Sequence, residues 1–131
     1  MTLPSSENAL GTHVLVDFFG CNVEFLNDRK TIEDCLSEAA IICGATIVEK
    51  VIHQFNPHGI SGVIVIAESH ITIHTWPENN FVAIDLFTCG DCLNADKAIS
   101  YLKNTFNAKD IKTQNIKRGL FSEIDKANNR D

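Results

Sequence analysis

The sequence predicts an α+β fold, a two-layer sandwich in which two helices cover one face of a mainly antiparallel sheet. Three observations indicate this fold: five or six apolar, β-branched runs of strand length, two segments with helical periodicity, and short connections between neighbouring runs. The chain has 131 residues, of which 44% are hydrophobic, so it is long enough for one domain with a substantial core. We therefore treat residues 1–131 as a single domain.

The first strand is expected over residues 13–19, which are mostly apolar. Residues 31–43 place apolar side chains at i, i+3, i+4 and i+7, the spacing of an amphipathic helix. Thr31 is its expected N-cap and Gly44 its expected stop.

The middle of the chain alternates between β-branched runs and turn residues. A turn is expected at the Asn-Pro-His-Gly sequence of residues 56–59 and another over residues 76–80. The runs between and beside these turns predict four strands, over residues 46–55, 62–67, 71–76 and 81–88.

The last third of the chain predicts one more helix and one more strand. Asn94 is a suitable N-cap for a helix whose apolar face runs from Ala95 to Phe106. Residues 109–116 form a weaker pattern that is typical of an edge strand. The polar ends, residues 1–11 and 118–131, are expected to be loose.

Several strands carry apolar residues on both faces. In residues 63–67, Val63, Val65 and Ala67 point one way, and Ile64 and Ile66 point the other way. Two helices cannot cover both faces of a sheet, so the second face is expected to pack against another copy of the chain in a dimer.

Composition excludes several classes of protein. Eleven Lys and Arg against seventeen Asp and Glu give a net charge of −6, which disfavours a nucleic-acid partner. No apolar run approaches the ~18 residues of a membrane helix, and residues 1–8 show no secretory signal. We therefore expect a cytoplasmic protein whose five cysteines are reduced thiols.

Residues 68–78 hold the highest concentration of reactive polar side chains, and the sequence allows three interpretations of them. The polar groups can be satisfied structural residues at the ends of strands. Cys89 and Cys92, with His70 or His74, can hold a metal or act as a redox pair. Ser69 or Cys89 can be a reactive group with His74 as its base.

Residues 68–78, Glu-Ser-His-Ile-Thr-Ile-His-Thr-Trp-Pro-Glu, followed by Phe-Thr-Cys-Gly at 87–90, closely resemble the prokaryotic short form of the S-adenosylmethionine decarboxylases. The Gly-Ile-Ser-Gly turn at 59–62 and the Gly-Cys pair at 20–21 also fit this family. The resemblance extends from about residue 11 to about residue 116. It implies a pyruvoyl-dependent decarboxylase of polyamine synthesis, made as a zymogen.

The resemblance implies that the chain cleaves itself between Glu68 and Ser69, into residues 1–68 and 69–131. Ser69 would attack the carbonyl of Glu68 and end as a covalent pyruvoyl group, the only cofactor, with no metal. The family gives the base of this autocatalytic cleavage to His74 and a supporting role to Ser61. It makes Cys89 the proton donor in decarboxylation, after the pyruvoyl carbonyl has formed a Schiff base with the substrate amine.

For the substrate, S-adenosyl-L-methionine, the resemblance implies that Phe55 stacks on the adenine and that Glu78 grips the ribose. Phe18 or Phe19 would supply a second stacking face. The product would be the decarboxylated aminopropyl donor for spermidine biosynthesis. The alternatives are a non-enzymatic small-molecule binding module on the same fold and a metal or redox protein that uses Cys89 and Cys92.

Two points stay open at the sequence level. His70 has no role that the residues or the resemblance supply. Ser69 and His74 are five residues apart, so a regular strand places them on opposite faces of the sheet. Either a bulge or turn intervenes, or the two residues meet across a subunit interface.

Overall fold

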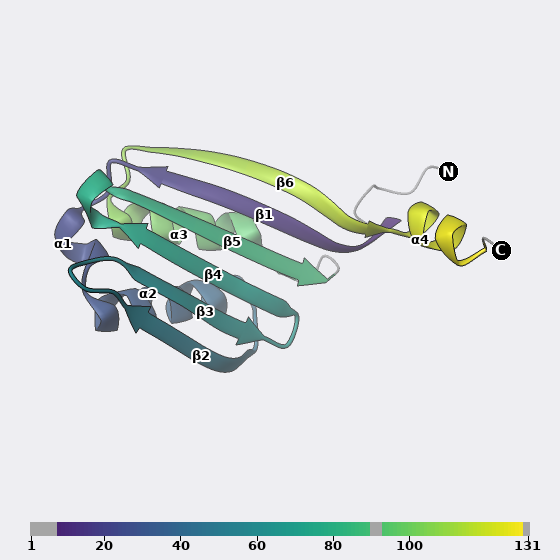
Figure 1. Cartoon of the computed structure of the whole chain (residues 1–131), viewed down its shortest axis with the longest axis horizontal. Helices are drawn as coiled ribbons and strands as arrows, with labels where there is room; N and C mark the ends of the chain where they lie inside the picture. The colour runs from purple at the N-terminus through teal and green to yellow at the C-terminus, as the bar shows by residue number, and fades with distance from the viewer. Residues whose placement is uncertain (1–7, 90–92, 130–131) are drawn as a thin grey trace.

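The computed structural model describes residues 8–89 and 93–129, which fold around one six-stranded sheet (Figure 1). The strand order is β2-β3-β4-β5-β1-β6, and every neighbouring pair is antiparallel. The strands are β1 (Ala9–Phe19), β2 (Ile47–Gln54), β3 (Ile60–Ile66), β4 (Ser69–Trp76), β5 (Phe81–Cys89) and β6 (Asp110–Leu120). The predicted α+β fold is confirmed, and the last strand lies at an edge as expected.

The two long helices are α2 (Arg29–Ile42) and α3 (Ala95–Phe106), and both lie behind the sheet in Figure 1. Asn94 caps α3 as predicted, because its side chain accepts a hydrogen bond from the N–H of Lys97. The predicted cap Thr31 is wrong. Asp28 is the N-cap of α2, and its carboxylate accepts the N–H groups of Lys30 and Thr31. The helix therefore begins two residues earlier than its apolar pattern indicates.

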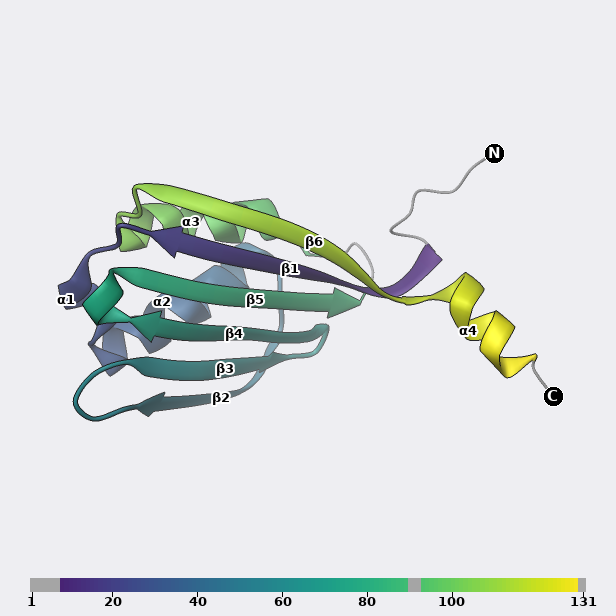
Figure 2. The ribbon, with the colours of Figure 1, turned by 45° about the horizontal axis from the view of Figure 1, so that its top comes forward.

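Three short elements were not predicted: helix α1 (Val23–Leu26), the 3-10 helix η2 (Pro77–Asn79) and helix α4 (Phe121–Asn128). The expectation of a loose segment over residues 118–131 is wrong for its described part. Residues 9–11 pair with residues 118–120, so β1 and β6 extend beyond the rest of the sheet, and α4 projects from their end (Figure 2). Backbone pairing stabilises this extension without an apolar pattern that the sequence would reveal.

The core lies between the sheet and the two long helices. Alternate residues of each strand enter it, as Val82, Ile84 and Leu86 do from β5. Phe18 of β1 is fully buried and packs edge-on against Phe106 of α3, with ring centroids 5.4 Å apart. This layer fixes the sheet as a rigid platform for the side chains on its other face.

We call the opposite surface of the sheet the open face, because none of the described helices covers it. It carries apolar residues such as Val63 and Phe87, as the alternation predicts. Its centre also holds a polar cluster, in which Thr72 donates to Asp85 at 3.1 Å and His13 lies 3.6 Å from the same carboxylate. The open face is therefore less uniformly apolar than the sequence pattern indicates.

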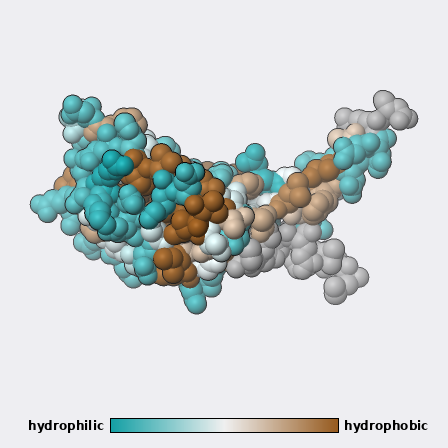
Figure 3. Space-filling model, turned by 90° about the horizontal axis from the view of Figure 1, so that it is seen from below, coloured by the Kyte–Doolittle hydropathy of each residue, from teal (hydrophilic) through white to brown (hydrophobic). Residues whose placement is uncertain are grey.

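Apolar side chains are also exposed on the edge strand β2, where Val48 is 64% exposed. The view from below shows apolar surface on the body of the molecule (Figure 3). Among the described helices, none is long and apolar enough to cross a membrane.

Candidate active site

The peptide bond predicted to break lies in the tight turn between β3 and β4. The carbonyl oxygen of Glu68 accepts a hydrogen bond of 3.1 Å from the backbone N–H of Cys89, at the end of β5. On the other side of the turn, the Glu68 side chain accepts the N–H of Thr46, and Ala67 donates to the carbonyl of Thr46. The turn is therefore fixed, and a donor already points at the oxygen that would carry charge during an attack on this carbonyl.

Ser69 follows this carbonyl in an unusual backbone conformation, with φ of 153°. Only glycine adopts this region readily, and other residues there carry roughly 1–3 kcal/mol of strain. The Ser69 hydroxyl lies 3.4 Å from Nδ1 of His70, which makes His70 the histidine beside the predicted nucleophile in its own chain. The sequence alone gave His70 no role, because this contact with Ser69 is visible only in the folded structure.

The other predicted site residues gather on the open face and beside the turns at the opposite ends of β3 and β4. Ser61 and His74 are direct cross-strand partners, and the Ser61 hydroxyl lies 2.8 Å from His74 Nδ1. A cavity of about 220 Å³ joins them to Phe55 and Glu78. The structure thus brings together the predicted processing pair and the predicted substrate-binding residues.

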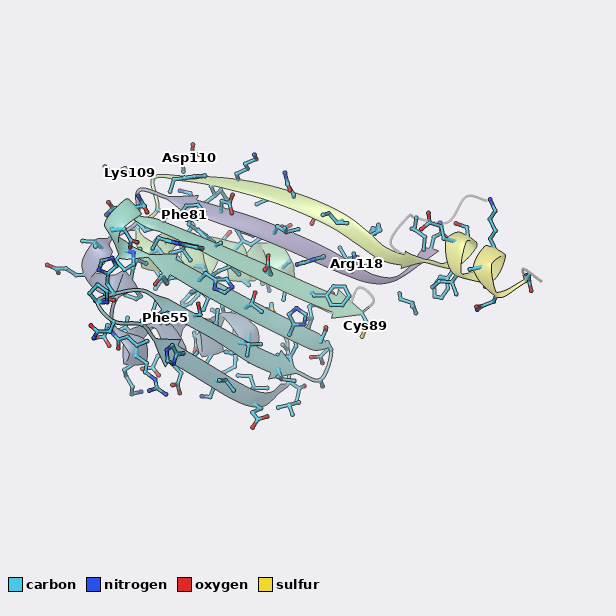
Figure 4. The ribbon with its side chains drawn as sticks, in the orientation of Figure 1. Phe55, Phe81, Cys89, Lys109, Asp110 and Arg118 are labelled. Carbon is cyan, nitrogen blue, oxygen red and sulfur yellow. The ribbon has the colours of Figure 1, made fainter. Side chains whose placement is uncertain are left out.

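Figure 4 shows the separation of the two groups, with Phe55 at one end of the sheet and Cys89 at the other. β4 pairs with β5 in unbroken register from Ser69 to Trp76, so no bulge brings His74 back toward Ser69. Five residues of strand span roughly 16 Å, and the two side chains leave the strand on opposite faces. Within one chain, His74 cannot contact Ser69.

Aromatic side chains surround the His74 group. His53 lies edge-on to Phe55 with ring centroids 4.5 Å apart. The ring centroids of His74 and Trp76 are 6.1 Å apart. Phe19 is 40% exposed, whereas Phe18 is fully buried in the core, so Phe18 cannot stack on a ligand. Sequence reasoning missed Trp76, although its position two residues after His74 on a strand predicts that both share a face.

The cysteines divide into two classes. Cys21, Cys35 and Cys43 are buried, and burial raises the pKa of Cys21 to about 11 and that of Cys35 to about 12. Cys89 is exposed beside the predicted scission turn, whereas Cys92 lies outside the described residues. Among the residues that are described, no three His, Cys, Asp or Glu side chains gather as a metal site would require.

Comparison with known proteins identifies the family of this chain. The sequence model of the family described as S-adenosylmethionine decarboxylase matches residues 12–119. The chain belongs to this family. It is 50% identical over 115 residues to the S-adenosylmethionine decarboxylase proenzyme of Syntrophomonas wolfei, an alignment that covers 88% of this chain and 91% of that protein. The proenzyme of Clostridium kluyveri is 46% identical over 117 residues, or 89% of this chain and 93% of that one.

Solved structures agree with the sequence comparison. The crystal structure of the adenosylmethionine decarboxylase from Aquifex aeolicus superposes with a TM-score of 0.80 at 36% identity, covering 86% of this chain and 93% of that chain. The predicted membership in the S-adenosylmethionine decarboxylase family is therefore confirmed, and the two groups of residues described above lie on a known fold of that family.

Proposed function

We propose that this chain is the precursor of a self-processing S-adenosylmethionine decarboxylase, a carboxy-lyase whose site is completed by a second copy of the chain. The observation that carries the proposal is the turn at Glu68 and Ser69, where a strained serine follows a carbonyl that already accepts the Cys89 N–H. The names of the S-adenosylmethionine decarboxylase relatives support the same activity for this chain.

Processing would begin when the Ser69 hydroxyl attacks the Glu68 carbonyl and the peptide nitrogen leaves, which converts the amide into an ester. The Cys89 N–H stabilises the negative charge on the carbonyl oxygen, and relief of the Ser69 strain favours the exchange. A base then removes the Ser69 α-proton, the Glu68 carboxylate leaves, and water releases ammonia from the remaining residue. Residue 69 thereby becomes the pyruvoyl end of the chain 69–131.

The base must come from a second copy, because His74 lies at the far end of its own sheet. If two open faces stack with their strands running in opposite directions, the Ser69 end of each chain lies over the His74 end of its partner. The backbone of residue 69, which carries the α-proton, and the exposed Cys89 thiol of one chain then lie over Ser61 and His74 of the partner subunit, while the Ser69 side chain leaves its strand on the other face. Ser61, 2.8 Å from Nδ1 of His74, would orient the imidazole toward the α-proton.

In the mature enzyme, the pyruvoyl group would supply the electron sink that allows the substrate carboxylate to leave as carbon dioxide. The side chains of the protein would bind the substrate and return a proton to it. Phe55 offers an exposed aromatic face for the adenine, and Glu78 offers a carboxylate for the ribose hydroxyls. The Cys89 thiol, beside residue 69, would return a proton to the substrate α-carbon. The net charge of −6 favours a cationic sulfonium substrate.

Replacement of Ser69 tests the proposal most simply. Ser69→Ala removes the attacking hydroxyl, so the protein should remain one chain and release no carbon dioxide from S-adenosylmethionine. The wild-type protein and the control Ser100→Ala, which alters an exposed serine of α3, should give chains 1–68 and 69–131, the second with a pyruvoyl end. Intact-mass analysis and a carbon dioxide assay measure both results. A wild-type chain that stays whole on long incubation contradicts the proposal.

The stacked dimer has its own test. Val63 lies on the open face at the middle of β3, where Val63→Asp would bury an unpaired charge between two sheets at a cost of several kcal/mol. Light scattering at micromolar concentration should find a monomer, and processing should slow with it. Val48→Asp adds the same charge to the exposed β2 edge and should leave the dimer intact. A Val63→Asp protein that is both dimeric and normally processed would refute the stacking.

A further inference from the structure

The turn between β2 and β3 carries a histidine that the mechanism above does not use. His58 Nε2 lies 3.2 Å from Oε1 of Glu78, which belongs to η2 between β4 and β5. The two side chains are 40% and 45% exposed, so they meet at the surface of the site and remain accessible to a ligand. This contact connects two turns that are far apart in the sequence.

Both turns are tied down, so the contact is held by backbone structure on each side. The N–H of Gly59 donates to the side chain of Asn27 at 3.0 Å, and the N–H of Phe55 donates to the carbonyl of Gly59 at 2.8 Å. On the Glu78 side, the amide of Asn80 donates to the carbonyl of Cys21 at 2.9 Å. The backbone on both sides of the contact between His58 and Glu78 is therefore held in place.

His58 and Glu78 together form the wall between two cavities. On one side is the cavity of about 220 Å³ that contains Phe55, Ser61 and His74. On the other side is a cavity of about 530 Å³, into which Glu24 of α1 and Asn27 also face. With no partner in the wall, the Glu78 carboxylate would be able to rotate into the larger cavity, away from the residues that bind substrate.

We propose that His58 is a positioning residue for Glu78: it occupies Oε1 and holds the carboxylate toward the smaller cavity, where Oε2 can accept the ribose hydroxyls of the substrate. This inference rests on the proposed function of the site. A carboxylate that is fixed before binding loses less side-chain entropy when the ligand arrives. The contact lies away from the bond that breaks, so its effect should fall on KM and not on kcat.

The experiment compares mature proteins, each shown by intact mass to be fully cleaved. His58→Ala should raise KM for S-adenosylmethionine about five- to tenfold and keep kcat within about twofold of wild type. His58→Gln places an amide N–H where Nε2 was and should restore KM to within about twofold. In a Glu78→Gln background, His58→Ala should add no further increase, since the group that His58 positions has lost its charge and its role.

Each outcome bears on one claim. Active wild-type enzyme with an unchanged KM in His58→Ala overturns the role of His58 and leaves the proposed function intact. A KM increase of equal size with and without Glu78→Gln also overturns it, because His58 would then act elsewhere. A cleaved wild-type protein that does not decarboxylate S-adenosylmethionine contradicts the proposed function, and the inference with it.

Discussion

Replacement of Cys89 by alanine is expected to lower the turnover of mature enzyme by about 10²–10⁴, the usual contribution of a positioned general acid. Cys89 is exposed at the end of β5, and its backbone N–H donates to the carbonyl of Glu68, which places residue 89 beside the scission turn. Without this acid, a proton could reach residue 69 instead of the substrate. Hydrolysis by water would then leave the substrate nitrogen on residue 69, which becomes alanine, and release the rest of the substrate as an aldehyde. The enzyme would therefore inactivate during turnover.

The measurement is product formation against time for processed Cys89→Ala protein, with mass analysis of chain 69–131 before and after turnover. Cys21→Ala is the matched control, because Cys21 is buried away from the scission turn. It should lower stability by roughly 1 kcal/mol and leave turnover of the folded enzyme unchanged. Wild-type turnover with an intact pyruvoyl end in Cys89→Ala would remove the thiol from the mechanism.

Replacement of His74 by alanine is expected to stop processing after the first step. The exchange of amide for ester needs only the Ser69 hydroxyl and the stabilised carbonyl, whereas the elimination needs a base near neutral pKa. His74→Ala protein should therefore accumulate as the ester, which has the same mass as the uncleaved chain. Hydroxylamine cleaves esters and spares amides, so it should cut His74→Ala protein at residue 68 and leave Ser69→Ala whole.

His70 provides the comparison for this experiment, because its Nδ1 lies 3.4 Å from the Ser69 hydroxyl within the same chain. If His70 were the base, the ester would accumulate in His70→Ala protein, and His74→Ala protein would be processed normally. We expect the reverse, since Ser61 holds His74 in a defined orientation at 2.8 Å. Normal cleavage in His74→Ala protein would contradict the assignment of the base.

Most of the fold could be predicted from periodicity, because burial on one face of a strand or helix imposes a regular spacing on the sequence. The alternation in residues 81–88 gave both the strand and its inward side chains, Val82, Ile84 and Leu86. The elements that escaped prediction are short or lie outside the core. α4 has eight residues and no buried side chain, and residues 9–11 are held by backbone pairing to β6.

The candidate site could also be predicted only in part. Its residue types came from a resemblance, and the parity of β4 correctly showed that Ser69 and His74 leave a regular strand on opposite faces. What could not be predicted was the contact set that depends on folding. The Cys89 N–H on the Glu68 carbonyl and the His58 contact with Glu78 join residues more than 19 positions apart, and local sequence patterns carry no information on such pairs.

The central claim is that each active site is built from two chains, and a mixed dimer tests it directly. His74→Ala and Ser69→Ala chains carrying different tags are produced together, and pairs are purified through both tags. In such a pair, the backbone of residue 69 in the His74→Ala chain lies over the intact His74 of its partner, so this chain should be cleaved although it remains whole when made alone. A partner that carries both substitutions should not support cleavage. If the His74→Ala chain stays whole opposite an intact His74, the shared site is contradicted.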